Sequence, residues 1–398
     1  MNKLREWFAS ETDGRTHLAL ESGFAWLLVL ATANLAPYDR AFFALWSLGR
    51  ENNAIRFVPH ALVLLAFAAA VARFAGLARR AMGIVACAAI AAIYAIVPAT
   101  YSNNLYTLWL MIVIVSFDPH PDYSLRRWLD ARRGPDVRAS RTLVPALVRA
   151  QVLIVYFGSV AVKCTHPWWR GTGRVIRQLA FEPLADTQLG FWNVPIRMLM
   201  ESPRVAAVAD VCVLGAELLI PLLLLVPERR RLAFGLGAAL HLFMQEWLFP
   251  RMFTFTMLTA YYAFCPSGDR SWVVTFDPER ASHRRIQKTF ARIDWLARTE
   301  WTAREGTSRI GVRASDGFAV SGLAAVLVLS VLTPVPLWLF ATFALVAPSV
   351  QWFGPVSRPA IENALVLAYG VAWIGAIATG GRRGMADRPG PRPGPDRG

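Results

Sequence analysis

Residues 152–173, which read VLIVYFGSVAVKCTHPWWRGTG, decide the fold. The stretch is apolar from Val152 to Val162, carries a lysine at its end, Lys163, and then breaks at Pro167. A lysine at the end of an apolar segment of membrane length is either an anchor whose ammonium reaches the head groups or a charge kept for chemistry. The interpretation of the whole chain therefore depends on the role of Lys163.

The composition of the chain is that of a membrane protein. The 398 residues are 55% hydrophobic and only 17% charged, whereas soluble domains carry about a quarter charged residues. The net charge of +15 comes from basic residues in short segments between apolar runs, where membrane orientation and anionic head groups explain them. We therefore expect an all-α, polytopic membrane protein whose partner is membrane lipid and not nucleic acid.

Apolar segments recur along the chain, and we expect roughly 8–11 membrane spans, each judged against the about 20 residues that a bilayer requires. The candidates are residues 18–37, 57–77, 82–99, 104–117, 142–163, 205–226, 232–249, 252–265, 317–334, 337–352 and 361–379. Two of them, 104–117 and 252–265, are short. These two span the bilayer only if their flanks continue the helix or if protein surrounds their ends.

Arginine-rich segments alternate with arginine-poor ones through the first eight candidate spans. Six arginines lie between Arg126 and Arg141, and ten lysines or arginines lie between Arg270 and Arg313. The positive-inside bias places both segments in the cytoplasm, together with the amino terminus. It places the Trp-rich and Arg-rich segment 164–203 on the external side. The orientation after residue 317 stays open.

This reading divides the chain into four parts. We expect a transmembrane domain at 1–270, a cytoplasmic basic amphipathic segment at 271–316, additional transmembrane helices at 317–380 and a disordered, solvated tail at 381–398. In the basic segment, apolar residues recur at helical spacing and basic residues occupy the other faces. The apolar set is Ile286, Phe290, Ile293 and Ala297, and the basic set is Arg284, Arg285, Lys288, Arg292 and Arg298. The pattern predicts a basic helix lying on the anionic leaflet.

Several ionisable residues lie inside the apolar segments. Each would cost about 2.5–3.5 kcal/mol if charged at the centre of an isolated spanning helix, so they must face protein or water. Asp210 and Glu217 are seven residues apart and share a helix face. Glu217 either forms an interhelical hydrogen bond that fixes the packing or belongs to a functional site. His241 is either a neutral histidine in the core or a proton carrier. The four cysteines form no CxxC pair, so no metal is expected.

The order of several short motifs resembles the horizontally transferred transmembrane (HTTM) domain family, which includes the vitamin K-dependent gamma-glutamyl carboxylases. The motifs are YFGSVAVK at 156–163, a Trp-rich turn with Gly171, AELLIP at 216–221, and a span with His241 followed by FTMLTAYYAFCP at 255–266. Together they extend the resemblance over about residues 10–270. The resemblance implies a helical membrane domain in the bacterial cytoplasmic (inner) membrane.

The resemblance also implies a site. Lys163 occupies the place of the lysine that deprotonates vitamin K hydroquinone in the carboxylases, and His241 matches a histidine of a later span. The implied cofactor is menaquinol or a vitamin K-type quinol, in a cavity that opens on the external side. The residues expected to bind it are Asn103, Asn104, Trp168 and Trp169. One departure is Leu105, which stands where the carboxylases have a histidine.

Two functions follow from these residues. The first is a quinol-linked enzyme of the carboxylase type, in which Lys163 is the base and His241 a hydrogen-bonding or proton-relay group. A lysine can act as a base near neutral pH when burial lowers its pKa. The alternative is a non-catalytic protein for maturation or export of a secreted peptide, or for lipid binding. In that case Lys163 is a snorkelling anchor.

Overall fold

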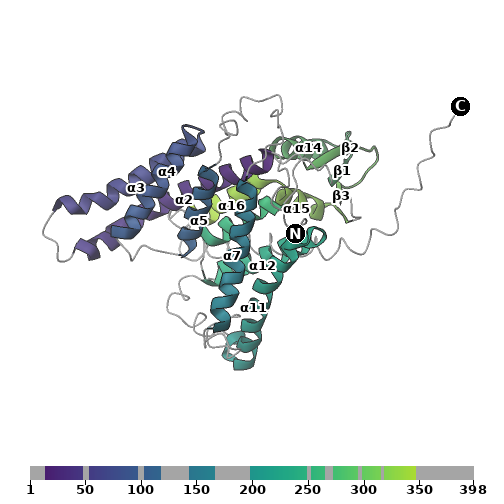
Figure 1. Cartoon of the computed structure of the whole chain (residues 1–398). Coiled ribbons are helices and arrows are strands. Elements are labelled where there is room, and N and C mark those ends of the chain that lie inside the picture. Colours follow the sequence, from purple (N-terminus) through teal and green to yellow (C-terminus); the bar gives the residue numbers. More distant parts are fainter. Residues whose placement is uncertain are drawn as a thin grey trace.

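Most of the described chain is helical. The computed structural model describes residues 14–47, 53–96, 103–117, 143–165, 198–248, 252–264, 272–294, 298–314 and 318–346. Within these ranges, helices pack around a large apolar core, and a small sheet stands at one end (Figure 1). The expected all-α membrane fold is therefore confirmed, although the sheet was not expected.

Helices account for the transmembrane part. They are α2 (Gly14–Ser47), α3 (Asn53–Phe74), α4 (Arg79–Ile96), α5 (Asn103–Ser116), α7 (Val144–Thr165), α11 (Pro203–Leu225), η4 (Pro227–Arg229), α12 (Arg230–Leu248), α13 (Met252–Ala260) and η5 (Tyr261–Phe264). Four stretches in the described ranges are long and apolar enough to cross a membrane: Thr16–Ala33, Arg79–Ile96, Val144–Thr165 and Pro203–Leu225. Length and composition thus make this an integral membrane protein.

The helix α2 forms the centre of the bundle. It contacts α3, α5, α13 and α16, and its described residues from Leu18 to Leu28 are nearly all buried. A helix that is apolar on all sides belongs inside a protein or a membrane. At Gly23 the neighbours approach closely, because a Cβ there would lie 2.7 Å from both Thr259 Cγ2 and Trp338 Nε1. Gly23 therefore lets α13 and α16 pack against α2.

A buried charged cluster joins four helices, and we call Glu21, Arg73, Arg79 and Ser116 the Glu21 cluster. Arg73 Nη2 lies 3.3 Å from Glu21 Oε1, and Arg79 Nη1 lies 2.5 Å from Glu21 Oε2. Arg73 Nη1 also donates to Ser116 Oγ at 3.0 Å. A buried charge needs such partners. The cluster therefore fixes α2, α3, α4 and α5 at one end of the bundle.

The segment predicted as a basic loop contains a four-stranded sheet. Its elements are β1 (Trp272–Phe276), α14 (Ala281–Ile293), β2 (Thr299–Ala303), β3 (Gly311–Ala314) and β4 (Ala319–Ser321). The strand order is β2-β1-β3-β4, with β1 and β2 parallel and the other pairs antiparallel. The helix connecting β1 to β2 carries the expected apolar and basic residues as far as Ile293. Arg298 lies beyond the helix and is buried, Ala297 lies outside the described residues, and the short strands were not expected.

One face of this sheet carries both helices of the unit. Val274 pairs with Val312 and Trp301, and these residues belong to a core that also contains Ile286 and Phe290 of α14. The same core includes four buried residues of α15 (Leu323–Leu332): Ala325, Val328, Leu329 and Leu332. The unit is therefore a two-layer α/β structure with its own core. We call residues 272–332 the α/β unit.

The α/β unit is joined to the bundle through α16 (Pro334–Val346), which follows α15 after the single residue Thr333. Helix α16 packs on α2 and α13, with Trp338 and Leu337 in the main apolar core. Tyr262 Oη donates to the carbonyl oxygen of Thr333 at 3.5 Å. The unit is thus held at the end of the bundle where η5 lies. The predicted span 361–379 and the predicted tail lie outside the described residues.

Candidate functional site

One face of α7 carries a row of polar side chains. Tyr156, Ser159 and Lys163 follow one another at spacings of three and four residues, which places them on one helix face. Arg149 extends the row by seven residues, and its Nε donates to the carbonyl oxygen of Ala263 at 2.6 Å. The buried face of an otherwise apolar spanning helix is therefore polar along much of its length.

Lys163 pairs with a carboxylate inside the protein. Its Nζ donates to Glu217 Oε1 at 2.5 Å, and Ser159 Oγ donates to Glu217 Oε2 at 3.1 Å. The exposed side-chain fractions are 17% for Lys163 and 6% for Glu217. Both carboxylate oxygens thus accept a bond from α7. The ammonium is directed to α11 and not outward, so this geometry is not that of a snorkelling anchor.

A second group of three rings lies next along the row. Tyr156 Oη lies 2.6 Å from His241 Nε2 of α12 and also bonds Tyr261 Oη of η5. His241 is 1% exposed, and its Nδ1 has no hydrogen-bond partner in the part of the chain that the structure describes. Tyr156 therefore connects the lysine-bearing helix to the histidine. We call Tyr156, His241 and Tyr261 the Tyr-His cluster.

A glycine makes room for this cluster. Gly237 lies one turn before His241 on α12, and a Cβ at Gly237 would stand 2.1 Å from Tyr261 Oη. No side chain can occupy that space while Tyr261 stays where it is. The local sequence of α12, with Gly237 and His241 four residues apart on one face, is therefore matched to the ring of Tyr261.

The comparison with known families bears on this part of the chain. The model of the HTTM domain matches residues 53–272, which are more than half of the chain. The chain belongs to the HTTM domain family. No curated protein and no solved structure matches it. The HTTM domain contains α7, α11, α12, α13 and η5, and its match ends at Trp272, the first residue of β1.

The structure brings together two of the residues that the sequence singled out in the HTTM domain. Both contact the polar face of α7: Lys163 belongs to it and pairs with Glu217, and His241 bonds Tyr156, which lies seven residues before Lys163. Asn103 and Asn104 begin α5, where only the backbone is described. Trp168 and Trp169, the other two expected quinol-binding residues, lie outside the described residues.

Three residues of the site were missed from the sequence: Tyr156, Ser159 and Tyr261. A signal for the first two existed, because they precede Lys163 by seven and four residues and so share its face. No sequence spacing relates Tyr261 to Lys163, since only the fold brings η5 to α7. Among the described residues, no group of three His, Cys, Asp or Glu side chains could hold a metal ion. The site of the HTTM domain is thus built from a lysine, a carboxylate, hydroxyl groups and an imidazole.

Proposed function

We propose that this HTTM protein is a membrane enzyme that removes a proton from a lipid-soluble quinol, with Lys163 as the base. The observation that supports the proposal is the contact between Lys163 Nζ and Glu217 Oε1, 2.5 Å apart within an apolar bundle. Groups that exchange protons are costly inside a membrane domain, and their presence there marks a functional site by default. We place the amine on the external side of a bacterial cytoplasmic membrane.

The residues present suit a quinol. When bound, a quinol supplies an acidic hydroxyl group and the two electrons of its reduced ring. Lys163 is accessible over 17% of its side chain, and Val162 beside it is 65% exposed, so an apolar ring arriving from lipid can reach the amine. The buried Nδ1 of His241 has no hydrogen-bond partner among the described residues, and such a buried polar atom calls for an explanation.

The ion pair explains how Lys163 could become a base. A protonated lysine accepts nothing, so its proton must move before it acts. In a low-dielectric interior the attraction between the two charges is strong, and so is the cost of keeping both of them away from water. With the proton on Glu217, Lys163 is a neutral amine. Ser159 then keeps the carboxyl group oriented, and the Tyr-His cluster holds α7, α12 and η5 in register.

The proposal is tested by two substitutions of one residue. Arginine keeps the charge of Lys163 but does not release its proton in a protein. Lys163→Arg and Lys163→Ala should therefore both slow the oxidation of menaquinol by dioxygen, supplied as the electron acceptor, in the reconstituted protein by about 10²- to 10⁴-fold. The matched control is Arg304→Ala, an exposed residue just after β2, which should leave the rate unchanged.

The same samples separate the enzyme from its alternative. Purified wild-type protein should carry menaquinone, detected by solvent extraction and absorbance. Full activity of Lys163→Arg would reduce Lys163 to a structural cation. Protein that carries only phospholipid, and that oxidises no quinol, would favour a non-catalytic role in maturing a secreted peptide or in binding lipid.

A further inference from the structure

Helix α14 exposes a row of cations that the rest of the α/β unit does not neutralise. Its sequence, ASHRRIQKTFARI, contains no acidic residue. Arg284, Arg285, Lys288 and Arg292 are all exposed, and none forms an ion pair with any residue that the structure describes. With Ala281 and Thr289 they border a shallow hollow of about 370 Å³. We call Arg284, Lys288 and Arg292, which recur every four residues, the α14 basic face.

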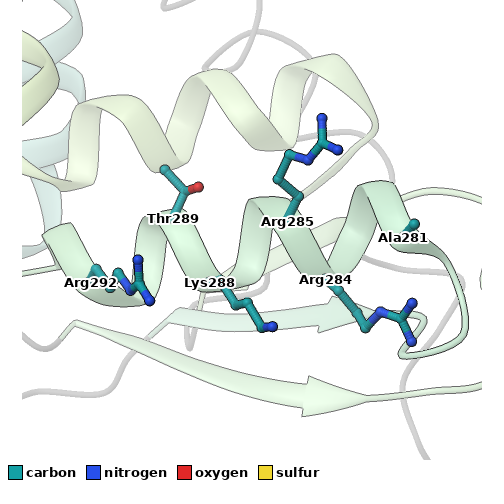
Figure 2. A pocket seen from close by; sticks show the side chains of 6 residues that line it. All are labelled: Ala281, Arg284, Arg285, Lys288, Thr289 and Arg292. Atoms are coloured by element: carbon teal, nitrogen blue, oxygen red, sulfur yellow. The ribbon is translucent and has the colours of Figure 1, made fainter.

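This arrangement opposes the stability of the helix itself. Arg284, Lys288 and Arg292 are four residues apart in turn, and like charges at that spacing repel on a helix surface. Arg284 also lies in the first turn, where the helix dipole disfavours a cation. Figure 2 shows the four basic side chains spread along α14, with Arg284 and Lys288 on one side and Arg285 on the other. A row of repelling cations that nothing nearby offsets indicates an anionic partner.

The apolar side of α14 is already occupied. Ile286 and Phe290 pack into the core of the α/β unit together with Val274 and Val312. The helix therefore cannot lie in the interface with its apolar residues inserted into lipid, as its sequence pattern indicated. Only its charged side is available to a partner. The contact must be electrostatic and made at head-group level.

The chain connections between the α/β unit and the bundle limit which anionic partner the unit can reach. Seven residues separate Phe264 of η5 from Trp272 of β1, so their distance is less than about 30 Å even when the chain is fully extended. At the other end, Thr333 alone separates α15 from α16, which packs inside the bundle. The unit is thus held at one end of a membrane-embedded bundle. The anions always within its reach there are lipid head groups.

We propose that the α14 basic face docks the α/β unit on the anionic lipid head groups of the leaflet next to it. The inference does not depend on quinol chemistry at Lys163. Each basic residue near an anionic surface favours the docked state roughly fivefold, so three of them favour it on the order of a hundredfold. Docking fixes the unit relative to the bundle and holds α15 and α16 in place.

The test uses the full chain in nanodiscs, with the native cysteines replaced and a fluorophore on Thr289→Cys. Head-group quenchers in the discs report the distance of the label from the lipid surface. We expect strong quenching in discs with 30% phosphatidylglycerol, about a third as much in neutral phosphatidylcholine discs, and loss of the difference on raising salt from 0.05 to 0.5 M, because the Debye length falls from about 14 to about 4 Å.

A charge-matched pair of variants tests the face itself. The change of Arg284, Lys288 and Arg292 to Gln should reduce quenching in anionic discs to the neutral-disc value. The control changes Arg304, Arg309 and Arg313 to Gln, which removes the same charge from loops and from the open face of the sheet, and it should keep the quenching. Equal quenching in both disc types, or an equal effect of the two triple variants, overturns the proposal. Binding of RNA by the purified protein, together with equal quenching in anionic and neutral discs, would overturn it in favour of a nucleic-acid partner.

Discussion

Gly237 is the residue at which the backbone of α12 is most closely matched to the site. An alanine there would place its Cβ 2.1 Å from Tyr261 Oη. We expect Gly237→Ala to displace Tyr261, to break its bond to Tyr156 and to lower the free energy of unfolding by about 1–3 kcal/mol. The measurement is thermal unfolding of the purified protein in detergent.

Gly215 on α11 is the matched control for that change. A Cβ at Gly215 meets nothing within 4 Å, and alanine is the better helix former by about 0.5–1 kcal/mol. Gly215→Ala should therefore be neutral or stabilising. If both alanine variants melt at the wild-type temperature, the position of Tyr261 does not require a glycine at residue 237.

Tyr156 is the residue that holds the Tyr-His cluster together. Tyr156→Phe keeps the ring but removes the hydroxyl group that both His241 Nε2 and Tyr261 Oη contact. A buried polar group left unsatisfied costs about 1–3 kcal/mol, so the melting temperature should fall. Tyr106→Phe, on the 38% exposed Tyr106 of α5, should change it little. Equal melting of Tyr156→Phe and wild type would mean that the hydroxyl does not stabilise the fold.

Part of the site could be predicted at this scale and part could not. Lys163, Glu217 and His241 stand out in the sequence because an ionisable group inside an apolar run is rare. Tyr156 and Tyr261 do not, since a tyrosine in such a run is also typical of a membrane-interface belt. Only the packing of η5 against α7 shows that their hydroxyl groups face each other. The partner of a polar group is a property of the fold.

At the scale of elements, the Glu21 cluster joins α2, α3, α4 and α5. Glu21→Gln keeps the shape of the side chain but removes the negative charge next to Arg73 Nη2 and Arg79 Nη1. Breaking a buried ion pair by neutralising one partner costs about 3–5 kcal/mol. We expect a large loss of stability in thermal unfolding, or loss of the folded protein on expression.

Glu201, which lies exposed just before α11, gives the control. Glu201→Gln should change the unfolding free energy by no more than about 0.5 kcal/mol. A Glu21→Gln protein as stable as Glu201→Gln would show that the Glu21 cluster does not tie these helices together.

The spans of the bundle follow from hydropathy, and the sheet does not. The segment expected at 142–163 is helix Val144–Thr165, and that expected at 205–226 is helix Pro203–Leu225. A long apolar run has few alternatives to a helix in a membrane. In the α/β unit, β4 has three residues and β3 four, too few for an alternating pattern to be read. Its core forms only when strands distant in sequence pair.

At the scale of the whole molecule, α7 connects two chemically different ends. Near its start, Arg149 donates to Ala263 beside the α/β unit, and near its end Lys163 pairs with Glu217. Fourteen residues of helix separate the two side chains, which is about 21 Å along the axis. The basic α/β unit and the Lys163 site therefore lie at different depths of the bundle. Which of the two ends faces the cytoplasm stays a prediction from the arginine counts.

The last prediction tests that arrangement in cells. Thr165 ends α7 and Ser308 lies in the α/β unit, and both are exposed. In a protein whose Cys87, Cys164, Cys212 and Cys265 are replaced by serine, Thr165→Cys should react with an impermeant maleimide added to intact cells. Ser308→Cys should react only after the membrane is opened, because ten basic residues between 270 and 313 keep that segment in the cytoplasm. Labelling of both cysteines from the same side would contradict this orientation. The proposed quinol site could then no longer be placed on the external side of the membrane.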